Sequence, residues 1–166
     1  MINAIQSRRS VRRFKNDPVT KEQLEQLLEA AMLAPSAHNT RPWEFIAVTQ
    51  REMLDKFSVT HPNAKMFLTA TAGILVVGIQ RPEMPEGYFS QDCAAATQNI
   101  LLQAADIGLG TCWCGVYPRP ERVSAFSELL DIREPKFPFG LIAIGVPNES
   151  TSQKGFYDQS KVTFIE

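Results

Sequence analysis

The chain is short of several residue types that define whole classes of protein. Three cysteines among 166 residues is an odd number without regular spacing, which argues against a secreted domain held by disulfides. The 17 basic and 18 acidic residues give a net charge of −1, so neither a nucleic-acid-binding protein nor a membrane-surface protein is indicated. The two histidines, His38 and His61, have no partner at metal-ligand spacing, and the sequence predicts no metal site.

A long uninterrupted apolar run is also missing. The N-terminal residues MINAIQSRRS lack the apolar segment of a signal peptide. The longest apolar stretch, residues 88–109, contains Asp92 and Asp106, whose charges a membrane span would tolerate only at high cost. We therefore expect a soluble protein of a reducing compartment, most simply the cytoplasm, without a membrane partner.

What is present is an alternation of helical and strand patterns, without an internal repeat or a linker. This alternation predicts one layered α/β or α+β domain over residues 1–166. Thr20 and Gln23 have capping-box spacing ahead of a helix that Pro35 ends. The expected helices cover residues 2–9, 20–34, 50–57, 64–70, 90–107 and 120–130, and the expected strands cover 43–49, 73–79, 111–116, 139–147 and 161–165.

Two of these elements raise the question of a partner. The helix at 90–107 is apolar around nearly its whole circumference, so it belongs either at the centre of the fold or at an interface. The strand KVTFI, at 161–165, has no hairpin partner nearby. It is either a frayed end with chance alternation or a strand added to a sheet, including the sheet of another subunit.

Two loops carry polar residues suited to a ligand. RRSVRRF, at 8–14, offers guanidinium groups and a serine hydroxyl, which favour phosphate, although a solvated basic turn has the same composition. APSAHNTRPWEF, at 34–45, joins a helix to a strand. Its short polar side chains could bond a planar ligand, or it could simply be a helix-terminal loop with Trp43 in the core.

The stretch TCWCGVYP, at 111–118, contains two cysteines in a C-x-C pattern. Positions two apart in a strand share a face, so Cys112 and Cys114 should lie on one side of the sheet, about 6.5–7 Å apart. That separation is long for a disulfide, and packed thiols are favoured over a dithiol redox pair. The pattern is not the C-x-x-C of thioredoxin-like sites.

Together, RRSVRRF, APSAHNTRPWEF, DCAAATQNILLQAADIGLGTCWCG and KGFYDQSKVTF resemble the FMN-dependent nitroreductase family, in the order and spacing of its compact members. The resemblance implies an α+β fold, with a mixed β-sheet flanked by helices. It also implies a homodimer built on the long central helices, in which each C-terminal tail adds a strand to the partner's sheet. Both the apolar helix and the orphan strand KVTFI fit such an arrangement.

The resemblance also assigns roles by position. Arg8, Arg9 and Ser10 match the segment that holds the FMN phosphate and ribityl chain, and Lys154 matches a C-terminal phosphate contact. The family often has a second basic residue where this chain has Phe156, which shifts the phosphate contact toward the N-terminal arginines. The loop that reaches the flavin of the second subunit is matched by Pro35, Ser36, Ala37 and Asn39, and the strand end against the isoalloxazine ring by Trp113, Cys114 and Gly115.

The implied activity is that of a flavin oxidoreductase. NADH or NADPH would reduce bound FMN, and a nitroaromatic, quinone or similar small acceptor would then be reduced at the same face, in a ping-pong mechanism. The catalytic feature expected of the chain is the backbone N–H at Gly115, directed at flavin N5. The alternatives are a specialised FMN enzyme for dehalogenation or oxidation, and a dithiol redox protein that uses Cys112 and Cys114.

Overall fold

Four strands of the described residues form one antiparallel sheet at the centre of the fold. The structure is a computed structural model that describes residues 1–85, 87–152, 155 and 157–166. The spatial order of the strands is β1-β2-β4-β3, so β1 and β3 form the two edges. Their bounds are Trp43–Val48 for β1, Ala72–Ile79 for β2, Gly110–Gly115 for β3 and Lys136–Gly145 for β4.

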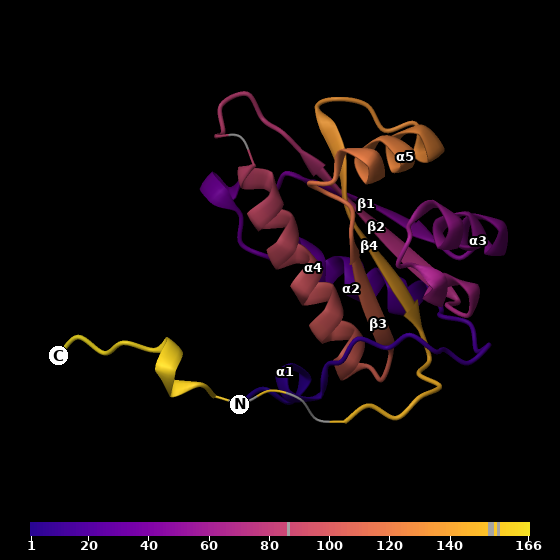
Figure 1. The fold of residues 1–166 in the computed structure, drawn as a ribbon, viewed down its shortest axis with the longest axis horizontal. Helices are drawn as coiled ribbons and strands as arrows, with labels where there is room; N and C mark the ends of the chain where they lie inside the picture. Colours follow the sequence, from indigo (N-terminus) through magenta and orange to yellow (C-terminus); the bar gives the residue numbers. More distant parts are fainter. Residues whose placement is uncertain (86, 153–154, 156) are drawn as a thin grey trace.

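Helices cover both faces of this sheet. Figure 1 shows α1 (Asn3–Ser7), α2 (Lys21–Met32) and α4 (Tyr88–Asp106) on one face. On the opposite face lie α3 (Arg51–Thr60) and α5 (Pro120–Leu130). Three short 3-10 segments complete the described elements: η1 (Ala37–Asn39), η2 (Lys65–Leu68) and η3 (Gln159–Lys161).

Two hydrophobic clusters hold the layers together. The central strands β2 and β4 are buried on both faces, which explains why their sequences are continuous apolar runs. One cluster joins the sheet to α2 and α4 through residues such as Leu27 and Ile100, and the other joins it to α3, η2 and α5 through residues such as Phe57 and Phe126.

The predicted start of α2 is confirmed in detail. The Gln23 N–H donates to Thr20 Oγ1 at 3.2 Å, and the Thr20 N–H donates to Gln23 Oε1 at 2.9 Å, which makes the reciprocal bonds of a capping box. The apolar helix α4 packs on α2 on one side and on the sheet on the other, which is the first of the two positions expected for it. Gln91 and Gln98 remain exposed on its outer surface.

The C-terminal segment differs from the prediction. Among the described residues there are four strands and not five, and residues 161–165 form no strand within their own chain. Instead the chain continues from η3 as an exposed extended tail that projects away from the body (Figure 1). The sheet was predicted to be mixed, but its four strands are all antiparallel. Within the described part of the chain, parallel pairing is limited to a single bridge between Ser10 and Thr111. A strand from a partner remains a prediction.

No helix in the described part of the chain is long and apolar enough to cross a membrane.

Candidate functional site

The outer edge of β3 carries the candidate site. In an antiparallel pair, alternate residues direct both their N–H and C=O groups away from the partner strand. The Thr111 carbonyl accepts a bond from the Val11 N–H at 2.9 Å, on the side away from β4, so Trp113 and Gly115 direct their backbone groups outward as well. The N–H of Gly115 therefore lies on the open edge of the sheet, as the predicted donor requires.

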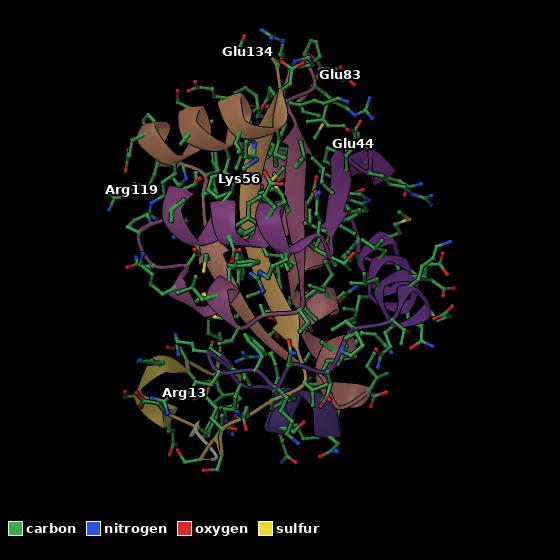
Figure 2. All side chains as sticks on the ribbon, turned by 90° about the vertical axis from the view of Figure 1, so that its right-hand side faces the viewer. Arg13, Glu44, Lys56, Glu83, Arg119 and Glu134 are labelled. Atoms are coloured by element: carbon green, nitrogen blue, oxygen red, sulfur yellow. The ribbon has the colours of Figure 1, made fainter. Side chains whose placement is uncertain are left out.

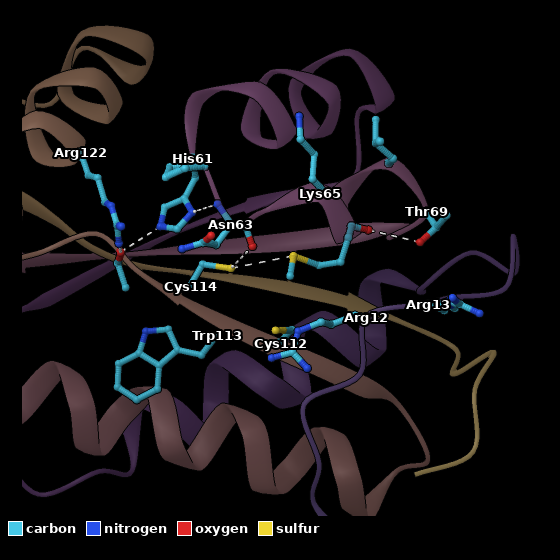
Figure 3. A pocket seen from close by; sticks show the side chains of 14 residues that line it. Arg12, Arg13, His61, Asn63, Lys65, Thr69, Cys112, Trp113, Cys114 and Arg122 are labelled. Atoms are coloured by element: carbon cyan, nitrogen blue, oxygen red, sulfur yellow. Dashed lines mark hydrogen bonds between the residues drawn. The ribbon is translucent and has the colours of Figure 1, made fainter.

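An open cavity of about 810 Å³ lies against this edge (Figure 3). Its floor is the end of β3, and its other walls come from the segment around η2, from α5 and from the N-terminal arginines. Four cationic side chains line the cavity: Arg12, Arg13, Lys65 and Arg122. A planar or anionic molecule would thus meet both backbone groups and positive charge.

Two side chains converge on the Gly115 carbonyl. His61 Nε2 lies 2.9 Å from this oxygen, and Arg122 Nη1 donates to it at 2.8 Å (Figure 3). The Asn63 N–H donates to His61 Nδ1 at 3.1 Å, which makes the imidazole neutral with its proton on Nε2. His61 thus connects the segment before η2 to the end of β3, and fixes both Asn63 and Gly115.

Burial sets the charge state of His61. The residue is 1% exposed and lies beside the ring of Phe126 and the Arg122 guanidinium. Burial lowers the pKa of His61, the bond to the Gly115 carbonyl opposes this shift, and the Arg122 charge adds to it. Protonation of the ring would also remove the acceptor of the Asn63 N–H.

The stability of the protein should therefore fall on acidification. Because the folded-state pKa of His61 lies below its unfolded value of about 6.5, the unfolded chain takes up the proton first. The contribution of neutral His61 to stability is fully present above the unfolded-state pKa of about 6.5. It is lost as the pH falls through the lower, folded-state pKa. Thermal melts between pH 7.5 and 5 should show this slope, and His61→Phe should flatten it while lowering stability by about 1–3 kcal/mol at pH 7.5. The exposed His38, replaced by glutamine, is the matched control; an equal loss of slope there would refute the assignment.

Trp113 lies on the other face of β3, toward α4. Its indole covers Gly140 of β4, where a Cβ would stand 2.5 Å from Nε1, so the ring can lie flat on the sheet only because residue 140 is glycine. Phe139 supports the ring at a centroid distance of 5.9 Å. Trp113 is 38% exposed and borders the cavity, so it offers an aromatic surface beside the open edge.

A second, basic groove of about 610 Å³ adjoins the cavity. It is formed by the N-terminal segment and by the chain after β4, and Arg12 lines both the groove and the cavity. Figure 2 shows Arg13 at this end of the molecule, opposite Glu83 and Glu134. The lining residues are Arg8, Arg9, Ser10, Arg12, Glu149, Ser150, Thr151, Ser152 and Gly155.

The spacing of RRSVRRF explains how the groove forms. Val11 and Phe14 are buried anchors, while Arg12 and Arg13 between them stay exposed. The backbone N–H groups of Arg12 and Arg13 donate to the Glu149 carboxylate at 2.5 and 3.2 Å. This carboxylate thus binds the backbone and fixes the segment on which the basic side chains are mounted.

Arg8 and Arg9, the first two residues of RRSVRRF, differ in their hydrogen bonds. Arg9 donates to the carbonyls of Ser152, Gln6 and Arg8 at 2.9, 2.7 and 2.5 Å, so it ties α1 to the chain after β4. Arg8 is half-buried at the groove and makes no side-chain hydrogen bond to another described residue. Arg8 is therefore the side chain here best placed to bind an anion.

The structure brings together most of the predicted residues. Arg8, Arg9 and Ser10 meet in the groove, and Trp113, Cys114 and Gly115 meet at the adjoining cavity. Lys154 and Phe156 lie outside the described residues. The loop residues predicted to contact the flavin border neither the groove nor the cavity of this chain. They are Pro35, Ser36, Ala37 and Asn39.

That loop is nonetheless held in a defined shape. The Ala37 N–H donates to the Oδ1 of Asp92, which is buried in α4, at 3.0 Å, and the Arg41 N–H donates to Ser36 Oγ at 2.9 Å. Asn39 has a positive φ of 54° and accepts from Arg41 Nε at 3.1 Å. The loop is thus fastened to α4, with Pro35 and Asn39 exposed on its surface.

The two cysteines of β3 share a face, as predicted, and all three cysteines are free and buried. A hydrogen bond from Cys114 lowers the pKa of Cys112 to about 7, against the effect of burial and with a contribution from Arg12. The same bond, together with burial, raises the pKa of Cys114. Burial raises the pKa of Cys93 in α4 to about 12.

Sequence patterns alone missed His61 and Arg122. The sequence argues against His61 as a metal ligand and assigns it no other role, whereas the structure buries it against Phe126 of α5. Arg122 lies in the first turn of α5, seven residues after Gly115, but no recognised motif links the two. Arg12 lies within RRSVRRF and could have been singled out, since it alternates with the buried Val11.

Comparison with known proteins identifies the family. The family model "Nitroreductase family" matches residues 5–59 and 56–146. A Methanothermobacter thermautotrophicus protein, provisionally named an NADH dehydrogenase/NAD(P)H nitroreductase, is 40% identical over 98% of this chain and 85% of its own. Among solved structures, an FMN-dependent nitroreductase from Clostridium difficile R20291 has a TM-score of 0.91 at 30% identity, covering 100% of this chain and 99% of its own. A Desulfovibrio desulfuricans structure, described provisionally as a nitroreductase in complex with FMN, has a TM-score of 0.77 at 28% identity, covering 92% of this chain and 90% of its own. The chain therefore belongs to the nitroreductase family and is an oxidoreductase.

Proposed function

We propose that the chain is an FMN-dependent oxidoreductase that takes electrons from NADH or NADPH and reduces nitroaromatics, quinones or similar small acceptors. The observation that carries this proposal is the outward edge of β3, where the Gly115 N–H borders an open cavity that adjoins a basic groove. The names of the similar proteins support it, because one is an FMN-dependent nitroreductase and another is described with FMN.

The residues present fit FMN in three respects. The groove offers Arg8 and Ser10 to a phosphate, as bidentate guanidinium and hydroxyl donors. The cavity beside it has room for a planar ring and carries Arg12 and Lys65 as positive charges. Gly115 leaves space for close approach, since a Cβ at this position would have no heavy atom within 4 Å.

Bound FMN would supply the redox chemistry, taking electrons from the nicotinamide donor and passing them to the acceptor. The chain's own part is binding and electrostatic stabilisation. The Gly115 N–H is a fixed donor on the open edge, and the bonds from His61 and Arg122 to the Gly115 carbonyl hold the following peptide in place. Arg12 and Lys65 favour negative charge in the cavity. The openness of that cavity allows donor and acceptor to use it in turn, as a ping-pong mechanism requires.

The geometry gives less support to a dithiol mechanism. Cys112 and Cys114 are 3% and 5% exposed, which denies them to a protein disulfide, and the raised pKa of Cys114 disfavours its thiolate. The specialised FMN enzyme remains the alternative within the same fold. It would bind FMN but fail to turn over nitroaromatics or quinones with NAD(P)H.

The absorbance spectrum of the purified protein tests the proposal. We expect a flavin spectrum, from FMN retained on purification or added back, which bleaches anaerobically with NADH or NADPH and returns with a quinone or nitroaromatic. A spectrum that shows no perturbation of added FMN would exclude the flavin. Bleaching without turnover of either acceptor would favour the specialised enzyme.

We further propose that the protein is a homodimer completed by exchange of its C-terminal tails. The tail exposes Val162, Phe164 and Ile165 by 39%, 72% and 97%, a large apolar surface for a free chain end. It projects away from its own body on the side of α4 (Figure 1). The loop at 35–39, which borders neither the cavity nor the basic groove of its own chain, would then contribute to the partner's flavin site.

The edge of β1 is the place we propose for the partner's tail. The edge of β3 is engaged at the Thr111 carbonyl by Val11 and at the Gly115 carbonyl by His61 and Arg122, and we reserve its Gly115 N–H for the flavin. β1 carries Phe45 and Ile46, both half-buried, and its outer edge pairs with no described strand. An apolar open edge of this kind normally needs a cover.

Removal of the tail should weaken the dimer. Deletion of residues 158–166 withdraws Phe164 and Ile165, each worth about 1.5–3 kcal/mol if buried, so the dissociation constant should rise at least about 10-fold. Light scattering over a dilution series measures this, and the full-length double substitution Phe164→Ser with Ile165→Ser should show the same direction. A truncated chain with the wild-type dissociation curve would contradict tail exchange.

A further inference from the structure

Two side chains from separate elements hold the loop at 35–39 from outside. Asp92, in the first half of α4, accepts the Ala37 N–H on its Oδ1 at 3.0 Å (Figure 1). Arg81, two residues after β2, donates from Nη2 to the Thr40 carbonyl at 3.1 Å, directly after the loop. Asp92, Arg81 and Thr40 also border one small cavity of about 10 Å³. The loop is therefore fastened on both sides, to α4 and to the chain after β2.

The backbone between these two anchors is in an unfavourable conformation. His38 and Asn39 have φ values of 50° and 54°, and Arg41 follows with 48°. Residues other than glycine rarely adopt this left-handed region, and several of them close together persist only where the surroundings enforce the conformation. The bonds from Asp92 and Arg81 act on either side of His38 and Asn39. Backbone strain of this kind is concentrated at binding and catalytic sites, so the shape of the loop points to a function.

Packing does not explain an aspartate at position 92. The residue is 8% exposed, on the face of α4 where Phe89 and Cys93 pack into the hydrophobic cluster. Its second carboxyl oxygen, Oδ2, is buried without a hydrogen-bond partner among the described residues, and the same holds for the Nε of Arg81. A buried polar atom without a partner destabilises a fold, and an apolar side chain here would avoid this loss. The bond from the Ala37 N–H gives the aspartate a purpose that packing does not.

We propose that Asp92 and Arg81 are positioning residues for the flavin site of the second subunit. They hold the loop at 35–39 in the conformation in which it meets the partner's FMN. A loop that is already fixed loses little conformational freedom when its ligand binds, which raises the affinity. Neither side chain lines the cavity beside β3 or the basic groove of its own chain, so both act through the loop. Their role rests on the FMN site and the homodimer proposed above.

Two substitutions separate the hydrogen bond of Asp92 from its packing. Asp92→Ala removes the acceptor of the Ala37 N–H and also the unpartnered Oδ2, and alanine favours a helix, so the variant should fold. Asp92→Asn keeps an oxygen acceptor for the same N–H. We expect the FMN dissociation constant of the full-length protein, measured by flavin fluorescence, to rise about 10-fold in the alanine variant and to return to within about 2-fold of wild type in the asparagine variant. Arg81→Met, which removes the donor to Thr40, should change it in the same direction as the alanine.

Hydrogen exchange measures the position of the loop without reference to activity. With and without FMN, the peptide covering residues 35–41 should exchange at least about 10-fold faster in Asp92→Ala than in the wild type, while peptides from β2 and β4 stay unchanged. Thr97→Val is the matched control, because Thr97 is also buried in α4 and its Oγ1 has no partner in the described part of the chain. It should leave loop exchange and FMN affinity at their wild-type values. Equal effects in Thr97→Val, or wild-type exchange and affinity in Asp92→Ala, would overturn the proposal.

A mixed dimer tests which subunit the loop serves. One chain carries Asp92→Ala and the other Arg8→Ala, each with its own affinity tag, and the dimer is purified on both tags in turn. If the loop acts on the partner's flavin, one site carries both defects and the other carries neither, so one FMN per dimer should bind with wild-type affinity. If the loop acts within its own chain, each site carries one defect, and the absence of wild-type affinity would overturn the proposal. A wild-type protein that binds no FMN would refute the proposed function as well, whereas wild-type binding without recovery in the mixed dimer would leave that function standing.

Discussion

Replacing Gly115 with proline is expected to lower the rate of flavin reduction by NAD(P)H about 100-fold or more. Proline removes the N–H that we place opposite the flavin, and loss of one preorganised donor to developing charge typically costs 10²–10³ in rate. The ladder to β4 is preserved, because residue 115 directs its backbone groups outward and proline is tolerated on such an edge. Stopped-flow reduction of the FMN-saturated protein measures the effect.

Gly115→Ala separates the donor from the space beside it. Alanine keeps the N–H, and its Cβ would meet no heavy atom of the chain within 4 Å. We therefore expect an intact fold and weaker FMN binding, with a much smaller loss of reduction rate than proline causes. Reduction at the wild-type rate in the FMN-bound proline variant would show that this N–H has no part in catalysis.

The second large effect is expected at the basic groove. Arg8→Ala removes a guanidinium with no other hydrogen-bonded partner among the described side chains, and a bond to a charged group contributes about 1.5–3 kcal/mol. The dissociation constant of FMN should rise roughly 10- to 100-fold, and its dependence on salt should weaken. Titration of the flavin-free protein by flavin fluorescence at two ionic strengths gives both values.

A charge-matched variant controls for net charge. Arg133 stands in the turn before β4, next to the Glu134 labelled at the far end of the molecule in Figure 2, and it pairs with Asp131 at the surface. Arg133→Ala changes the net charge as Arg8→Ala does and should leave FMN affinity unchanged. Equal losses in the two variants would mean that long-range charge holds the cofactor, and not a contact at Arg8.

The sequence was most informative where local chemistry sets structure. Thr20 with Gln23 predicted the start of α2 because both capping partners lie within one turn. The apolar runs at 73–79 and 139–147 predicted the strands β2 and β4, and the structure buries both strands on both faces. The tail at 161–165 could not be decided in this way, because its strand pattern has no partner within its own chain.

The site was predictable only in part for a related reason. RRSVRRF and TCWCG are local motifs, so both can be recognised in the sequence without knowledge of the fold. His61 lies 54 residues before Gly115 and meets it only when the chain folds, so no spacing in the sequence predicts this contact. Arg122 is seven residues after Gly115, but no recognised motif marks the pair. The loop at 35–39 showed suitable residues, but its proposed role depends on a second subunit.

The alternation of β3 leaves little tolerance for changes in its length. Even-numbered residues carry the sulfurs toward η2, and odd-numbered residues carry Trp113 toward α4 and expose the Gly115 backbone at the edge. One residue inserted between Gly110 and Gly115 would shift the register and exchange these directions at every later position. The donor, the indole and the thiols would be lost together. Loops elsewhere can lengthen as this chain diverges, whereas β3 can change only by substitution.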